Sequence, residues 1–127
     1  MSAPFQVGFA PIWRQGQAAD TDPHGIDQHA PGAKLDAGKQ RPALVLGEFA
    51  NALQTVVEVG TYGAAKYSPS GWLSVPDGEA RYLDAAMRHL LAMFGGEALD
   101  QESGIEHLAH ATWNLLAVAE LRERGEE

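Results

Sequence analysis

The sequence predicts an all-α protein, a helical bundle built on an antiparallel helix hairpin with an irregular N-terminal arm. Apolar residues recur at helical spacing in three segments, at about Pro42–Lys66, Glu79–Phe94 and Ile105–Arg124. Alternation of apolar and polar residues at period two is weak, and Gln6–Phe9 is the one strand candidate. A loop of about ten residues joins the last two helices, and so short a connection favours antiparallel packing.

The first 33 residues form the predicted arm, and residues 34–127 form the predicted domain. The arm is rich in proline and glycine and has no sustained helical or strand period. Its apolar side chains would be poorly solvated in a free tail, so we expect it to pack on its own domain or on a second subunit. These side chains are Phe5, Phe9, Ile12 and Trp13. The pattern favours a homo-oligomer.

The first two helices have recognisable ends. Pro42 suits an early helical position, and Gly60 and Gly63 are expected to break or kink the far end of that helix. The second helix is expected to end at the pair Gly95-Gly96. We expect it to bury one apolar face, made of Leu83, Met87, Leu90, Leu91 and Phe94.

The third helix carries the most informative pattern of the chain. His107, His110 and Asn114 lie at i, i+3 and i+7, within about 60° of one helix face. Ser103 is the expected N-cap, with Glu106 completing a capping box. A second arc is expected to face the core, made of Ile105, Leu108, Thr112, Leu115 and Leu116. The histidine stripe can either bind a ligand or form hydrogen bonds within the bundle.

Composition excludes several classes of function. The chain has 127 residues, no cysteine and a formal net charge of −8. Disulfides and thiolate zinc sites are therefore excluded, and a duplex nucleic acid is an unsuitable partner for an acidic surface. The sequence has no run long enough to span a membrane and no signal-peptide pattern, so a cytoplasmic protein without a membrane partner is expected.

The helix hairpin is expected to gather candidate metal ligands. Antiparallel packing brings Arg88 and His89 toward His107 and His110. The connecting loop adds carboxylates, namely Glu97, Asp100 and Glu102. Mixed histidine and carboxylate ligands suit Mn²⁺, Fe²⁺ or Zn²⁺, whereas carboxylates with water suit Mg²⁺. The H-x-x-H spacing alone is a weak signal, and its value comes from the nearby carboxylates.

Two further segments favour a phosphate-bearing ligand. The segment Lys34–Arg41 contains a glycine that permits close backbone approach, and Lys39 and Arg41 supply cations. It lacks Walker A spacing, and a solvated basic turn is an equally good interpretation. Tyr67 and Trp72 can stack on a base while Lys66 pairs with phosphate, or the rings can simply close the core. No nucleophile paired with a base is apparent.

These motifs together resemble the phage and prophage dATP/dGTP diphosphohydrolase family, over about residues 32–121. The motifs are Lys34-x-Asp-x-Gly-Lys-x-Arg41, Tyr62-Gly-x-x-Lys-Tyr67 with Trp72, Arg81-Tyr82 with Arg88-His89, and Gly96-Glu97-x-x-Asp100-x-Glu-Ser-Gly-x-x-His107-x-x-His110-x-x-x-Asn114. The resemblance implies hydrolysis of purine deoxynucleoside triphosphates to monophosphate and pyrophosphate with Mg²⁺, Mn²⁺ or another transition metal, as part of phage nucleotide-pool remodelling in the host cytoplasm.

A more distant similarity is to the all-α MazG-type pyrophosphohydrolases, whose paired acidic motifs bind Mg²⁺. Here His107 and His110 stand where the second acidic motif would be, and Ala85, Arg88 and His89 replace the first. Either histidines and loop carboxylates rebuild the metal site, or Mg²⁺ chemistry has been lost. The alternative function is a non-catalytic nucleotide-binding or phage interaction protein.

The hypothesis assigns a role to each candidate residue. The catalytic candidates are His107, His110, Glu102 and Arg88. The metal ligands are His89, Glu97, Asp100, His107 and His110. The substrate-binding residues are Lys34, Asp36, Lys39, Arg41, Lys66, Tyr67, Trp72, Arg81 and Asn114. The general base is either a histidine or Glu102.

Overall fold

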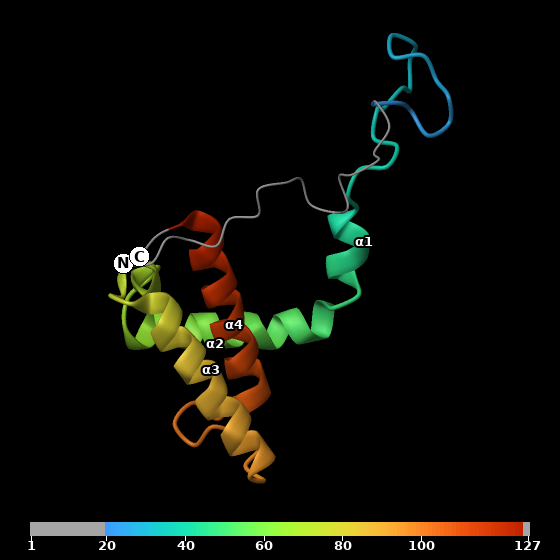
Figure 1. Ribbon diagram of the computed structural model, residues 1–127. Coiled ribbons are helices and arrows are strands. Elements are labelled where there is room, and N and C mark those ends of the chain that lie inside the picture. Colours follow the sequence, from blue (N-terminus) through green and yellow to red (C-terminus); the bar gives the residue numbers. More distant parts are fainter. Residues whose placement is uncertain (1–19, 126–127) are drawn as a thin grey trace. The chain divides into compact units, whose positions relative to one another are not determined.

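The computed structural model describes residues 20–125 and confirms the all-α fold (Figure 1). The helices are α1 (Pro42–Gly47), α2 (Ala50–Lys66), the 3-10 helix η2 (Gly71–Ser74), α3 (Gly78–Phe94) and α4 (His107–Arg124). The chain divides into two compact units, of which the described parts are residues 20–48 and 49–125. We call them the N-terminal unit and the helical unit. The strand candidate Gln6–Phe9 and the apolar arm residues lie outside the described residues.

The N-terminal unit is organised around the buried carboxylate of Asp22. This carboxylate accepts backbone N–H groups of His24 at 2.7 Å, Ile26 at 3.3 Å and Lys34 at 2.9 Å. These hydrogen bonds, led by that from Lys34, lower the pKa of Asp22. Asp22 therefore closes the loop that precedes α1, which is a structural role.

The predicted first helix is interrupted. α1 ends at Gly47, and Phe49 has φ −106° and ψ 23°, outside the helical range. Glycine is a weak helix former, which is consistent with an end at this position. By contrast, α2 continues through Gly60 and Gly63 to Lys66, so the expected break there was wrong.

Gly60 serves close packing between α2 and α4. A Cβ atom at this position would lie only 3.1 Å from Trp113 Nε1. The missing side chain leaves room for the indole ring, while the backbone remains helical. This contact places the indole ring of Trp113 beside the middle of α2.

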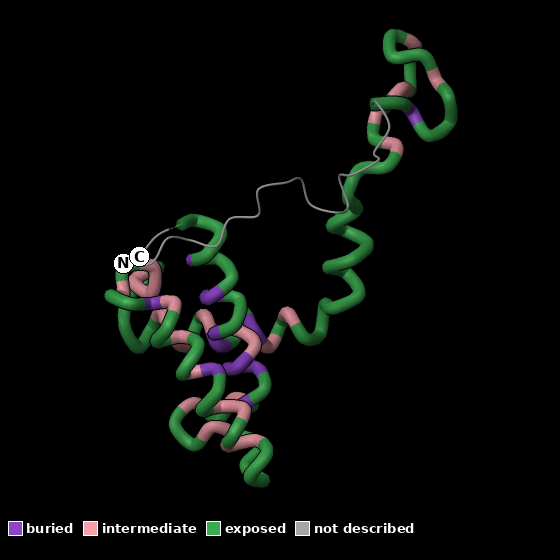
Figure 2. The backbone as a smooth tube through the Cα atoms, viewed as in Figure 1, coloured by how far each residue is buried: buried purple, intermediate pink, exposed green. Residues whose placement is uncertain are grey.

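α3 and α4 pack antiparallel and form the most extensive helix pair of the helical unit. Ala86 of α3 is completely buried. Buried residues recur along α4 (Figure 2), and several of them are small. The buried residues of α4 are His107, Ala109, His110, Ala111, Asn114, Ala117, Val118 and Leu121. The alanines allow close approach of the two helices, so the histidine stripe faces the interior.

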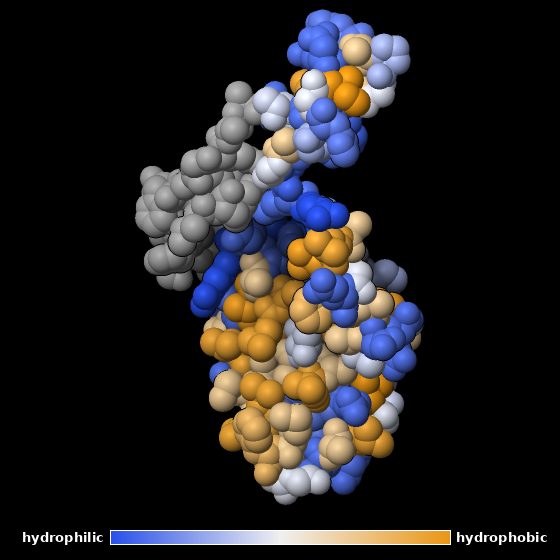
Figure 3. All heavy atoms as spheres, turned by 90° about the vertical axis from the view of Figure 1, so that its right-hand side faces the viewer, coloured by the Kyte–Doolittle hydropathy of each residue, from blue (hydrophilic) through white to orange (hydrophobic). Residues whose placement is uncertain are grey.

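The expected core faces of the last two helices were wrong. Leu108, Leu115 and Leu116 of α4 are each about half exposed, although they were expected to face the core. On α3 the side chains of Leu83, Met87, Leu91 and Phe94 are also exposed. Figure 3 shows hydrophobic residues gathered on one face of the helical unit. The polar stripe can be buried because the described residues include no buried side-chain nitrogen or oxygen without a hydrogen-bond partner.

The loop before α4 is closed by backbone hydrogen bonds rather than by the predicted capping box. The N–H of Asp100 donates to the Ile105 carbonyl at 2.8 Å, and the N–H of His107 donates to the Ala98 carbonyl at 2.9 Å. The N-cap of α4 is Glu106, and among the described residues its side chain forms no capping hydrogen bond. Ser103 instead bonds to a histidine side chain, as shown below.

Ala86 provides a test of the α3–α4 packing. Ala86→Leu is expected to lower the free energy of unfolding by about 1–3 kcal/mol, because a close-packed helix contact has no room for the larger side chain. The exposed Ala119 of α4 is the matched control, and Ala119→Leu should have little effect. Chemical denaturation of both variants measures the difference, and equal stabilities would contradict the packing described here.

Within residues 20–125, no helix combines the length and hydropathy needed to cross a membrane.

Candidate functional site

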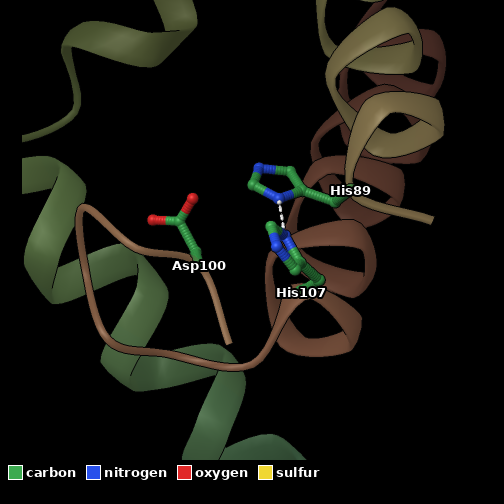
Figure 4. A group of neighbouring side chains, drawn as sticks. All are labelled: His89, Asp100 and His107. Atoms are coloured by element: carbon green, nitrogen blue, oxygen red, sulfur yellow. Dashed lines mark hydrogen bonds between the residues drawn. The ribbon is translucent and has the colours of Figure 1, made fainter. Parts of the chain in front are cut away.

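His89, Asp100 and His107 form a compact group at one end of the α3–α4 hairpin (Figure 4). His89 comes from α3, Asp100 from the connecting loop, and His107 from the first position of α4. One ligand atom from each residue lies within 4.8 Å of the others, and the two Nδ1 atoms of His89 and His107 are 2.8 Å apart. Such a set of nitrogen and oxygen donors could hold one metal ion.

Glu97 fixes the ring orientation of His107. A carboxylate oxygen of Glu97 lies 2.8 Å from His107 Nε2. Because an ionised carboxylate only accepts hydrogen bonds, Nε2 carries the proton in the neutral ring and Nδ1 keeps its lone pair. That lone pair is directed toward His89. Glu97 was expected to be a metal ligand, but it lies outside the compact group and acts here on the orientation of a ligand, as carboxylates commonly do behind metal-binding histidines.

His110 lies beside the group with different partners. Its ring stacks on His89 with a centroid distance of 4.5 Å and an interplanar angle of 9°. Its Nε2 lies 2.7 Å from Ser103 Oγ and 3.9 Å from an Asp100 oxygen. Ser103 Oγ accepts the Ile105 N–H and has a second lone pair, which can accept His110 Nε2–H while the hydroxyl hydrogen is donated to Asp100. His110 is therefore held by a serine and lies outside the compact ligand group.

The pKa shifts favour the protonation states that a metal requires. Burial is the main cause that lowers the pKa values of His89 and His110, and neighbouring histidines add to it. Burial raises the pKa of Asp100, but hydrogen bonds from Ser103 outweigh this effect and the net pKa is lowered. At neutral pH these two imidazoles are thus uncharged and Asp100 is ionised.

A second polar cluster lies on the neighbouring helix. Lys66, the last residue of α2, donates to both carboxylate oxygens of Glu102, at 2.8 and 2.9 Å. Tyr62 also forms a side-chain hydrogen bond with Glu102. The bonds to Lys66 and then to Tyr62 lower the pKa of Glu102. Glu102, predicted as a general base or a loop carboxylate, is therefore an ionised partner of Lys66.

A pocket of about 590 Å³ connects the two clusters with an aromatic region. Its polar end includes His89, Asp100 and His110, together with Lys66 and Glu102. Its volume lies in the range of pockets that hold small molecules. All residues that line it belong to the helical unit.

Three rings meet edge to face at the aromatic end. Trp72 lies 5.5 Å from Trp113 and 6.1 Å from Tyr82, measured between ring centroids, and all interplanar angles exceed 70°. The Tyr82 hydroxyl donates to the Trp72 carbonyl at 3.1 Å. These contacts hold Trp72 against the pocket, and its role in contacting a base stays a prediction. Tyr67 also lines the pocket, but it is 77% exposed.

The predicted cations of the helical unit differ in their surroundings. Arg88 is exposed, lines the pocket, and its charge contributes to the lowered pKa of His89. Arg81 also lines the pocket but donates to the Pro76 carbonyl at 3.1 Å. Asn114 lines the pocket from α4, and its amide donates to the His110 carbonyl at 2.8 Å.

The four remaining predicted substrate-binding residues belong to the N-terminal unit. They are Lys34, Asp36, Lys39 and Arg41. Lys39 lies 4.0 Å from the Asp20 carboxylate, and the Lys34 backbone N–H is bound by Asp22. Their role in substrate binding stays a prediction.

Three residues of the site received no site role from the sequence. Tyr62 lines the pocket and bonds to Glu102, Ser103 bonds to His110, and Trp113 forms part of the aromatic end. Tyr62 and Trp113 could have been found from helical spacing, because they lie four residues before Lys66 and three after His110. Ser103 gave a misleading signal because its spacing to Glu106 also fits a helix cap.

Comparison with known families supplies the context for this site. The profile described as dATP/dGTP diphosphohydrolase, N-terminal, matches residues 29–127. The chain belongs to this family. The match includes every residue that lines the pocket and the basic segment of the N-terminal unit.

One relative carries the same description. A dATP/dGTP diphosphohydrolase of Salmonella phage PMBT28 is 31% identical over 87 residues, which are 68% of this chain and 28% of that protein. The chain therefore spans less than a third of the length of this relative. A search of solved structures finds no significant match.

Proposed function

We propose that this member of the dATP/dGTP diphosphohydrolase family hydrolyses purine deoxynucleoside triphosphates to monophosphate and pyrophosphate with a divalent metal. One observation carries the proposal. His89 and Asp100 belong both to the compact ligand group and to the wall of the pocket. A metal held by that group would face the ligand, with cations and aromatic rings along the same wall.

The residues of the compact group suit a borderline transition metal. Two imidazoles and one carboxylate would hold Mn²⁺, Fe²⁺ or Zn²⁺, whereas Mg²⁺ prefers oxygen ligands. The lone pair of His107 Nδ1, directed by Glu97, supports this fit. When bound, the metal would neutralise phosphate charge and lower the pKa of water. We propose Mn²⁺ ahead of Mg²⁺ among the expected cofactors.

The side chains of the pocket supply binding and proton transfer. Arg88 and Lys66 neutralise the phosphates, and Trp72 contacts the purine from the aromatic end. His110 is a better general base than Glu102, because its imidazole is neutral while the ion pair with Lys66 makes Glu102 a weak base. Ser103 holds His110 in place through the hydrogen bond to Nε2. The reaction would occur in the cytoplasm of the phage host.

Incubation of the purified chain with each deoxynucleoside triphosphate and Mn²⁺, Mg²⁺ or Zn²⁺ tests the proposal. Chromatography should detect monophosphate and pyrophosphate from dATP or dGTP. Nucleotide binding without product would instead favour the non-catalytic function, for which the lack of both acidic motifs of the MazG type is the supporting observation.

We also propose a homodimer or homotetramer. The leucine arc of α4 and the apolar side chains of α3 remain exposed, and a second copy would bury them. Leu116→Glu is expected to shift the protein toward monomers, whereas Asn51→Glu at an exposed site of α2 should not. Light scattering at micromolar concentration measures this shift. A monomeric wild-type chain would contradict the assembly.

A further inference from the structure

We propose that Lys66 and Tyr62 form a subsite for a phosphate group, which the side chain of Glu102 fills when no ligand is bound. The inference rests on the proposed function for the identity of the ligand as a nucleotide phosphate. It adds a residue, Tyr62, and an internal competitor, Glu102. The geometry of one ion pair carries the argument.

Glu102 satisfies the donors as a phosphate would. Both of its oxygens accept hydrogen bonds from Lys66 Nζ, at 2.8 and 2.9 Å, and Tyr62 forms a further hydrogen bond with the same carboxylate. A phosphate oxygen pair has the same acceptor character and more negative charge. The Lys66 ammonium also lies 5.9 Å from the Tyr62 ring and 5.2 Å from the Tyr67 ring. The cation is thus held in place at the pocket wall.

The two carboxylates of the pocket differ in their freedom to move. The Asp100 side chain is 21% exposed and accepts the Ser103 N–H at 2.8 Å, so the loop holds it in place. The Glu102 side chain is 62% exposed, and it forms hydrogen bonds with the side chains of Lys66 and Tyr62. Rotation of the Glu102 side chain alone would release the donors without movement of the backbone. Exposed ion pairs contribute little stability, so a polyanion can compete for the lysine.

The negative charge of Glu102 opposes the binding of a triphosphate in the same pocket. Arg88 supplies a second cation on the same wall, near His89. While Glu102 is in place, its charge neutralises Lys66. Displacement of Glu102 leaves both Lys66 and Arg88 free to interact with the ligand. The carboxylate acts as a competitor that weakens binding of small anions and is overcome by ligands of high charge.

Binding of inorganic pyrophosphate to metal-free protein tests the inference directly. Isothermal titration in EDTA would compare the wild type with Glu102→Gln, which keeps the size of the side chain and removes its charge. We expect Glu102→Gln to bind pyrophosphate at least about fivefold more tightly, since a unit charge at hydrogen-bonding distance changes an interaction by this factor even in water. Unchanged or weaker binding, or no binding by either protein, would overturn the inference.

Two further variants exclude a general charge effect. Glu79→Gln also removes a carboxylate from an ion pair, the one with Arg122, but Glu79 does not line the pocket. The affinity of this variant for pyrophosphate should therefore equal that of the wild type. In a Lys66→Met background, Glu102→Gln should give no gain. A gain that persists without Lys66 would contradict the subsite.

The readout is independent of hydrolysis. Failure of the chain to hydrolyse nucleotides, with the expected pyrophosphate affinities, would remove the proposed reaction and keep the subsite. If the chain hydrolyses nucleotides but Glu102→Gln leaves the affinity for pyrophosphate unchanged, the subsite is removed and the proposed reaction is kept.

Discussion

His107→Ala is expected to lower Mn²⁺-dependent hydrolysis of dATP or dGTP at least about 100-fold, because it removes one donor of a three-residue ligand group. The same change should weaken Mn²⁺ binding at least about tenfold, measured by titration calorimetry. Glu97→Gln should lower hydrolysis and Mn²⁺ affinity less, because Glu97 orients His107 and is not itself a member of the ligand group.

A histidine outside the site provides the control for this variant. His29 is exposed in the N-terminal unit, so His29→Ala removes an imidazole without changing the ligand group. Circular dichroism should show the helix content of the wild type for both variants. Full turnover by His107→Ala, or equal metal affinity of the two variants, would contradict a metal role for His107.

The fold could be predicted from the sequence because its helices carry local signals. The predicted second and third helices differ from α3 and α4 by no more than two residues at each end, and Gly95-Gly96 ends α3 as expected. Hydrophobic period identifies a helix and its faces, but it does not state which face is buried. In α4 the alanines around His107 and His110 determine which face is buried, because small residues allow close contact with the neighbouring helix.

The candidate site was partly visible for a related reason. Helical spacing placed His107 and His110 on one face, and the short loop indicated that His89 and Asp100 would be close. Spacing could not separate the partners of the two histidines. Only the geometry shows that His107 faces His89 and Asp100 while His110 bonds to Ser103. The ion pair between Lys66 and Glu102 spans 36 residues of sequence, and no local pattern predicts such a contact.

That difference between the two histidines leads to a prediction that separates catalysis from metal binding. His110→Ala is expected to lower the turnover of dATP or dGTP by at least about tenfold while leaving Mn²⁺ affinity within about threefold of the wild type. His110 lies outside the compact ligand group, and its neutral imidazole faces the pocket beside Asp100. Loss of a base slows the chemical step, whereas loss of a ligand also weakens the metal.

Ser103 extends this test to the orientation of His110. Ser103→Ala removes the hydrogen bond to His110 Nε2 and keeps the imidazole, so it should lower turnover less than His110→Ala does. Turnover at saturating Mn²⁺ and titration calorimetry would be measured on the same preparations of both variants. A tenfold or greater loss of Mn²⁺ affinity in His110→Ala would show that His110 is a ligand after all, and unchanged turnover would exclude it from the reaction. A loss of turnover at constant metal affinity is the result that the stacked, serine-bound position of His110 requires.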